Sequence, residues 1–226
     1  MSKYWALYGS KQTLIISALL AVGMILCVIA KPTRNVWAVI IGAPLALVMP
    51  GFLYRSVLQS IAKQKTNEEI GLFDFPYFKI ALVSFLGVIV EMLCGGILIV
   101  INLITRFCIP VILAYLVIYT ENTKNIKSIM DMAKRGLKFT FRKHFLTVLI
   151  MQIFYMIAMA CLAVGIPVVD LVIPMEKLFF IPAVYFIALS GVYLMTKMIE
   201  YEENENSLSF ENLDRWKTQE IMGNGE

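Results

Sequence analysis

Few side chains in this sequence could act together as acids, bases or nucleophiles. His144 is the single histidine, so one chain cannot build a metal site or a proton relay from two histidines. There is no HExxH, GxSxG, P-loop or GxGxxG motif. Because His144 stands where an apolar segment begins, we interpret it as an interfacial residue and not as a base. We therefore expect no catalytic residue, no metal, no cofactor and no enzymatic activity.

The four cysteines do not form a metal-binding or redox pattern. Each lies in an apolar run and no CxxC pair occurs; they are Cys27, Cys94, Cys108 and Cys161. Isolated thiols in such surroundings pack as small hydrophobic side chains. We expect all four to be reduced.

Polar side chains inside apolar segments are the other candidates for chemistry, and they are Glu91, Arg106 and Gln152. A charge at the centre of a membrane span costs about 3 kcal/mol, which the many apolar residues around Glu91 outweigh. Glu91 is either part of a proton, cation or substrate path, or a protonated acid bonded to Gln152, Asn102 or a backbone carbonyl. Arg106 is expected to extend to the nearer membrane surface.

The composition determines which elements must position these residues. Of 226 residues, 59% are hydrophobic and 16% are charged, whereas soluble domains have about 45–50% and about 25%. The sequence therefore predicts an all-α integral membrane protein. Its length allows about six spans of about 20 residues and no separate soluble domain. The net charge of +4 does not indicate a nucleic-acid partner.

Six apolar segments are predicted to span the membrane as three helical hairpins, with amphipathic or polar segments between them. They are Thr13–Ala30, Val36–Tyr54, Ile80–Val100, Ile101–Tyr119, Phe145–Val169 and Leu178–Thr196. The boundary between the third and the fourth is the weakest, because Asn102 is the only turn signal there. We expect a tight hairpin at this point; one long tilted helix followed by a re-entrant segment, between residues 97 and 110, is the alternative.

The distribution of basic residues predicts the orientation. With the N-terminus inside, sixteen of the twenty Lys and Arg residues fall on the cytoplasmic side. Positive residues are enriched on that side of membrane proteins. Both termini are therefore expected to be cytoplasmic, with residues 31–35 and 170–177 outside. Residues 1–200 would form the transmembrane domain and residues 201–226 an acidic cytoplasmic tail.

Residues 124–143 are predicted to form an amphipathic helix on the membrane surface. Its apolar side chains recur at spacings of three and four, and they are Ile126, Ile129, Met130, Ala133, Leu137 and Phe141. Its basic side chains lie on the opposite face, and they are Lys124, Lys127, Lys134, Arg135, Lys138, Arg142 and Lys143. Such a helix is typical of binding to anionic headgroups or to an acidic partner.

Small residues at helix-packing spacing occur in the first two segments. Ser17 precedes Ala21 by four positions, and Gly42 precedes Ala46 by four. Such pairs allow two helices to approach closely. They could pack inside one chain or between two chains, and we expect internal packing.

The order of several features resembles a known family. They are Phe73–Phe78 before the third segment, Pro110 and Tyr115 in the fourth, Glu121, Ile126-Lys127-Ser128-Ile129, Ala133-Lys134-Arg135-Gly136, and Lys143-His144-Phe145. This order is similar to the six-span membrane domain found beside some bacterial glycerophosphodiester phosphodiesterases, and to its stand-alone relatives of unknown function. The phosphodiesterase domain is not present, so no catalytic residue carries over. The resemblance implies a bacterial membrane scaffold or anchor.

The permease subunits of ABC exporters provide the second interpretation. They also have six spans and cytoplasmic termini, and Arg55–Lys65 could serve as a coupling helix. We thus expect a non-enzymatic subunit or scaffold of the bacterial inner membrane, in contact with anionic headgroups and other membrane-protein subunits. The alternative is an exporter subunit for a peptide or hydrophobic substrate, driven by a separate ATPase.

Overall fold

The computed structural model describes residues 11–33, 36–66, 71–73, 76–94, 99–119, 126–168 and 173–206. Within these ranges every regular element is a helix, which confirms the predicted all-α class. The elements are α1 (Lys11–Thr33), α2 (Val36–Thr66), α3 (Tyr77–Cys94), α4 (Ile99–Ile118), α5 (Ile126–Lys138), the π-helix η3 (Phe139–Lys143), α6 (Phe145–Val168) and α7 (Ile173–Asn206).

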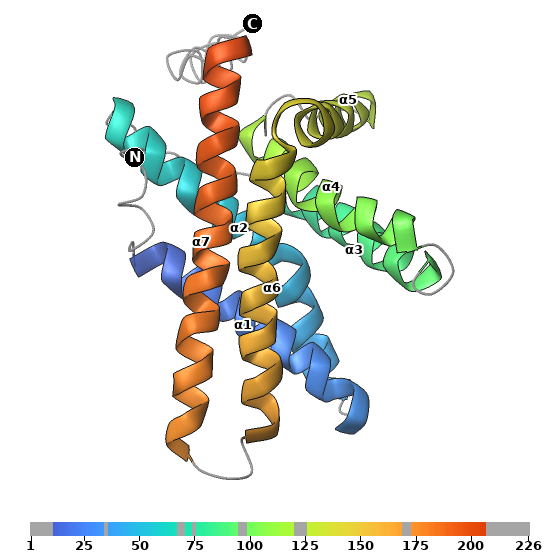
Figure 1. Ribbon diagram of the computed structural model, residues 1–226, viewed down its shortest axis with the longest axis vertical. Coiled ribbons are helices and arrows are strands. Elements are labelled where there is room, and N and C mark those ends of the chain that lie inside the picture. Colours follow the sequence, from blue (N-terminus) through green and yellow to red (C-terminus); the bar gives the residue numbers. More distant parts are fainter. Residues whose placement is uncertain are drawn as a thin grey trace, which may run out of the picture.

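Helices that follow each other in the chain pack side by side. Figure 1 shows the long helices α6 and α7 next to each other, with α1 and α2 crossing them obliquely. The pair α3 and α4 points away from α6 and α7, and α5 packs on α4 near the upper end of α6. The end of α7, the end of α2 and α5 are therefore found towards one end of the molecule.

Four helices are long and apolar enough to cross a membrane. They are α1, α2, α6 and α7, whereas α3 and α4 contain shorter apolar stretches at Tyr77–Val90 and Ile104–Ile118. The 34 residues of α7 extend about 51 Å, well beyond the hydrocarbon core of about 30 Å. By length and composition the chain is a multi-pass membrane protein.

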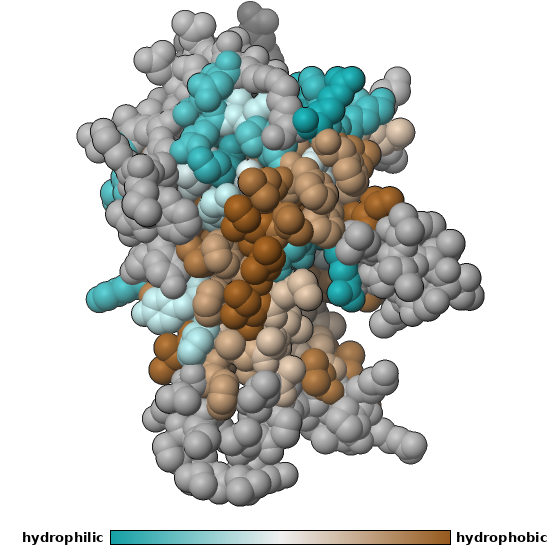
Figure 2. All heavy atoms as spheres, viewed as in Figure 1, coloured by the Kyte–Doolittle hydropathy of each residue, from teal (hydrophilic) through white to brown (hydrophobic). Residues whose placement is uncertain are grey.

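Large apolar side chains cover much of the outer surface. On α1, Ile15, Leu19 and Val22 form one exposed stripe, and α2 exposes Trp37 and Ile40. Contiguous apolar surface of this kind is uncommon on soluble monomers. In Figure 2 the hydrophobic residues gather along the middle of the visible face, and hydrophilic residues gather at the end where α5 and the end of α7 lie. This distribution suits a molecule whose middle faces lipid.

The boundary predicted between the third and fourth segments is wrong. Helix α3 ends at Cys94 and α4 begins at Ile99, so Asn102 lies inside a helix instead of in a turn. Gly95 and Gly96 follow α3 directly in the sequence, and glycine is a weaker helix former than asparagine. The glycine pair was therefore the better boundary signal.

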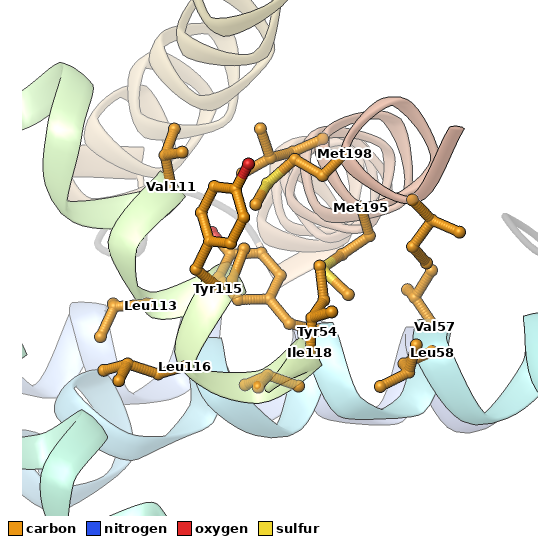
Figure 3. Close-up of a cluster of buried hydrophobic side chains, with 14 of the residues drawn as sticks. Tyr54, Val57, Leu58, Val111, Leu113, Tyr115, Leu116, Ile118, Met195 and Met198 are labelled. Carbon is orange, nitrogen blue, oxygen red and sulfur yellow. The ribbon is translucent and has the colours of Figure 1, made fainter. Parts of the chain in front are cut away.

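The second half of α2 belongs to the main hydrophobic core. Residues 55–65 were considered above as a separate coupling helix, but they continue α2 to Thr66, and Val57, Leu58 and Ile61 are buried. Figure 3 shows Val57 and Leu58 in one cluster with Tyr115 of α4 and with Met195 and Met198 of α7. The same cluster also includes Ile61 of α2, Met132 of α5 and Phe139 of η3. This core therefore joins α2, α4, α5, η3 and α7.

A close contact between glycines joins α1 and α2, which run antiparallel. A Cβ added to Gly42 would lie 2.7 Å from the Leu26 Cβ and 3.1 Å from the Gly23 carbonyl oxygen. A Cβ added to Gly23 would lie 2.9 Å from the backbone nitrogen of Ala46. Gly42 and Ala46 thus pack inside the chain, as expected from their spacing.

Candidate functional site

A buried carboxylate lies where α7 meets α4 and α5. Glu202 is only 1% exposed, although it was assigned above to the acidic tail. Helix α7 continues to Asn206 and carries Tyr201 and Glu202 into the core, so this first part of the predicted tail is helical. Residues 207–226 lie outside the described part of the chain.

Two phenols on α4 and just beyond its end hold the carboxylate of Glu202. The Tyr115 hydroxyl donates a hydrogen bond of 2.7 Å to Oε1, and the Tyr119 hydroxyl donates to Oε2. The two tyrosines are four positions apart, so they lie on the same side of α4, and their rings stack with centroids 6.2 Å apart. Each carboxylate oxygen therefore has a protein donor, as a buried charge requires.

An arginine on α5 completes this group. The Arg135 Nη1 lies 3.8 Å from Glu202 Oε2, and its Cζ lies 5.3 Å from the centroid of the Tyr119 ring. The Arg135 side chain is 46% exposed, so the ion pair connects the core with the surface. We call Tyr115, Tyr119, Arg135 and Glu202 the Glu202 cluster.

Aromatic rings pack beside the Glu202 cluster. The ring of His144 stacks on Phe139 at 4.6 Å and meets the edge of Tyr201 at 5.0 Å, and Phe139 also contacts Tyr115. The π-helix η3 produces this arrangement, because the His144 backbone N–H donates to the Phe139 carbonyl five positions earlier. His144 thus packs against aromatic rings at the start of α6.

Helix α5 rests on the protein along one side. Met132 is buried, Gly136 lies against Ile112 of α4, and the Thr140 hydroxyl donates to the Gly136 carbonyl. A Cβ at Gly136 would be 3.1 Å from Ile112 Cγ1. The absence of a side chain at Gly136 therefore lets α5 lie close to α4.

The opposite side of α5 and η3 combines apolar and basic side chains. Met130, Leu137 and Phe141 are 56%, 40% and 51% exposed. Three exposed cations lie beside them, and they are Lys134, Lys138 and Arg142. Lys134 is also 3.8 Å from Asp131 of the same helix. We call Met130, Lys134, Leu137, Lys138, Phe141 and Arg142 the α5 surface.

The remaining predicted basic residues are placed in part. Lys124 lies outside the described part of the chain; Lys127 and Lys143 lie in α5 and η3, but their side chains are outside that description. The prediction put all seven basic residues on one face. Arg135 is exposed like Lys134, Lys138 and Arg142, and its guanidinium also pairs with Glu202 of α7.

Two of the three intramembrane candidates, Gln152 and Arg106, are in contact with each other. Gln152 of α6 donates a hydrogen bond of 2.5 Å to the Arg106 carbonyl on α4. Pro110 stands four positions after Arg106 and has no N–H, so it cannot donate the usual helical hydrogen bond to that carbonyl. Gln152 supplies the missing donor. Glu91 is in α3, and its side chain lies outside the described part of the chain.

One sequence signal points to Glu202. Buried residues on α7 recur at spacings of three and four, and they are Ile187, Gly191, Met195, Met198 and Glu202. Continuing this stripe past residue 200 places Glu202 on the buried side of the helix. The acidic composition of residues 202–205 conceals the signal, because such a run is typical of a solvated segment.

No protein-family model, curated protein or solved structure matches the chain. Among the described residues, no three His, Cys, Asp or Glu side chains gather as a metal site, and Cys27, Cys108 and Cys161 are free thiols. The fold and the two features at one end, the Glu202 cluster and the α5 surface, carry the functional argument. They belong to a multi-pass membrane protein with an amphipathic helix held against its helices.

Proposed function

We propose that the chain is a non-enzymatic scaffold subunit of the bacterial inner membrane, with six apolar helices in the bilayer and both termini in the cytoplasm. The α5 surface would lie on the anionic cytoplasmic leaflet. The observation that carries this proposal is the side-by-side exposure of Leu137 and Phe141 with Lys138 and Arg142. A helix with such a surface lies at the boundary of headgroups and acyl chains.

The forces at this surface are of two kinds. Each basic residue near an anionic leaflet contributes about 1 kcal/mol, and salt screens this attraction. Burying Leu137 and Phe141 among acyl chains adds a hydrophobic contribution to the binding free energy, and salt does not weaken this contribution. Binding to the leaflet is therefore expected to weaken in salt but not to vanish.

The way in which α5 is held supports the proposed scaffold role. It packs on α4 and is joined to α7 by an ion pair, so its surface has a fixed place relative to the bundle. A fixed surface at the leaflet would hold the bundle in one orientation, in which its exposed apolar helices can pack against other membrane proteins.

Lipid contact is tested by reconstituting the full chain in phosphatidylcholine vesicles with and without phosphatidylglycerol. Bimane attached at a cysteine introduced for Phe141 reports the polarity around it. We expect a blue-shifted emission that strengthens with phosphatidylglycerol, whereas the same probe at exposed Lys63 on α2 is the control. Emission at residue 141 that stays typical of water in both vesicles would contradict the proposal.

The scaffold role is tested by purifying the tagged chain from its own membranes in mild detergent. We expect a second membrane protein to co-purify in fixed ratio and to crosslink to the exposed stripe of α1 or α2. Recovery of the chain alone would contradict the scaffold role. Recovery with a nucleotide-binding ATPase would favour the exporter instead.

A further inference from the structure

We propose that the ion pair between Arg135 and Glu202 sets the rotation of α5 about its own axis, so that Leu137 faces the lipid. Arg135 is then a positioning residue and not one of the lipid contacts. This inference rests on the proposed contact between α5 and the membrane, and it assigns the orientation of α5 in that contact to the ion pair.

The geometry of α5 carries the argument. Leu137 follows Arg135 by two positions, which is about 200° around an α-helix. With Arg135 directed towards Glu202 on α7, Leu137 lies on the other side of the helix, and its side chain is 40% exposed. Lys134 and Lys138 flank Arg135 on the helix, and both are exposed. Among these three exposed basic residues, Arg135 is the one that pairs with a residue of α7.

Glu202 is well suited to fix the rotation of α5 about its own axis. Its carboxylate is buried, and the Tyr115 and Tyr119 hydroxyls each donate to one of its oxygens. The carboxylate that pairs with Arg135 is therefore held in one position. At 3.8 Å the pair is a charge contact and not a hydrogen bond. Other described contacts of α5 are apolar, such as Met132 and Phe139 in the core and Gly136 against Ile112. Among the described side chains of α5, Arg135 is therefore the one with an ion pair to α7.

The ring of Tyr119 supports the same position of Arg135. The guanidinium lies 5.3 Å from the ring centroid, within the range of a cation–π contact. Tyr119 therefore holds both partners of the ion pair, one through its hydroxyl and one through its ring.

The experiment compares two neighbouring positions on α5 in the full chain. Spin labels are placed at cysteines introduced for Leu137 or for Lys138, in a variant without native cysteines, and the protein is reconstituted in vesicles of phosphatidylcholine and phosphatidylglycerol. We expect oxygen, which partitions into lipid, to relax the label at residue 137 more, and a water-soluble nickel complex to relax the label at residue 138 more.

Replacing Glu202 by glutamine should remove this contrast. The carboxamide keeps the size of the side chain and removes its charge. We expect amide exchange in α5 to become roughly tenfold faster, the factor that corresponds to about 1.4 kcal/mol. The matched control is Glu200→Gln, because Glu200 pairs with Lys197 at 2.7 Å on the same helix and does not connect α7 to α5 through that pair. The control should keep the contrast.

The outcomes separate this inference from the proposed function. A contrast that survives Glu202→Gln as it survives Glu200→Gln would overturn the positioning role and leave the lipid contact intact. A wild-type label at residue 137 that behaves like the label at residue 138 would overturn both. If Glu202→Gln does not fold, the half-exposed partner is changed by Arg135→Gln, and loss of the contrast supports the inference whereas its retention overturns it.

A double-variant cycle distinguishes positioning from general stability. Once either partner is changed, changing the other should add little to amide exchange in α5, because the same contact is already lost. Effects on exchange that simply add would overturn the inference.

Discussion

The crossing of α1 and α2 and the Glu202 cluster join helices in opposite ways. At the crossing, Gly23 and Gly42 bring two backbones together, and a Cβ added to either would meet backbone atoms or a leucine Cβ. In the Glu202 cluster, a carboxylate, two phenols and a guanidinium connect three elements through long side chains. The glycine crossing depends on the absence of side chains at two positions. The Glu202 cluster depends on specific oxygen and nitrogen atoms of its side chains.

The difference follows from the surroundings of each contact. In lipid, apolar side chains gain little by leaving the solvent, so helix association depends on close packing. Beyond the hydrocarbon core, water and headgroups compete for polar groups, and a carboxylate needs its own donors to stay buried. Close packing therefore joins α1 and α2 at this crossing, whereas polar contacts join α5 to Tyr119 and to α7.

The largest expected effect is on the Glu202 cluster. Glu202→Ala removes the acceptor of Tyr115 and Tyr119 and leaves Arg135 without its partner. Breaking a buried charge pair costs about 3–5 kcal/mol, and we expect the lower part of this range because Arg135 is half exposed. Thermal unfolding in detergent measures the loss. An unchanged midpoint would show that the cluster does not stabilise this end.

The next effect concerns the glycine crossing. Gly42→Ala adds a Cβ that meets the backbone of α1, whereas Gly191→Ala meets the flexible end of the Leu53 side chain. Overpacking costs about 1–3 kcal/mol, and a backbone cannot move aside as a side chain can. Gly42→Ala should therefore lower the unfolding midpoint more than Gly191→Ala. The reverse order would contradict the close approach at Gly42.

A smaller effect is expected at the proline of α4. Gln152→Leu removes the donor to the Arg106 carbonyl and should cost about 0.6 kcal/mol, the mean for side-chain hydrogen bonds in a membrane protein. In a Pro110→Ala background the restored N–H can serve that carbonyl, so the cost of Gln152→Leu should fall. Equal costs in the two backgrounds, measured by unfolding, would show that Gln152 does not serve the freed carbonyl.

The class of protein and the positions of most helices could be predicted from hydropathy. The helix observed at Ile126–Lys138 was also visible from its periodicity. The position of Glu202 was not predicted, because its burial depends on phenols contributed by a helix more than eighty positions earlier in the chain. The direction of Arg135 could not be derived either, since its partner belongs to a distant helix.

The partner of Gly42 was missed for a related reason. Spacing within one helix indicated Gly42 with Ala46, but the contact also needs Gly23, which lies on another helix and outside the pattern of Ser17 and Ala21. Periodicity shows which face of a helix is small or apolar. It does not show which helix covers that face.

A small effect that depends on salt is expected at the α5 surface. Lys138→Gln should weaken the interaction of α5 with phosphatidylglycerol by at most about 1 kcal/mol, and the difference should shrink as salt is raised. Lys63→Gln on α2 is a control with the same change in charge. Bimane emission at residue 141, followed across a salt series, measures both variants. An equal response to the two substitutions would show that Lys138 has no special place at the leaflet.

The position of α5 on the cytoplasmic side is tested most directly by labelling a cysteine introduced for Lys134, which is exposed on this helix. A maleimide that cannot cross membranes is added to intact cells and to permeabilised cells, in a variant without the native cysteines. We predict that residue 134 reacts only after permeabilisation. Reaction in intact cells at the rate seen in permeabilised cells would contradict the proposed orientation and, with it, the contact of α5 with the inner leaflet.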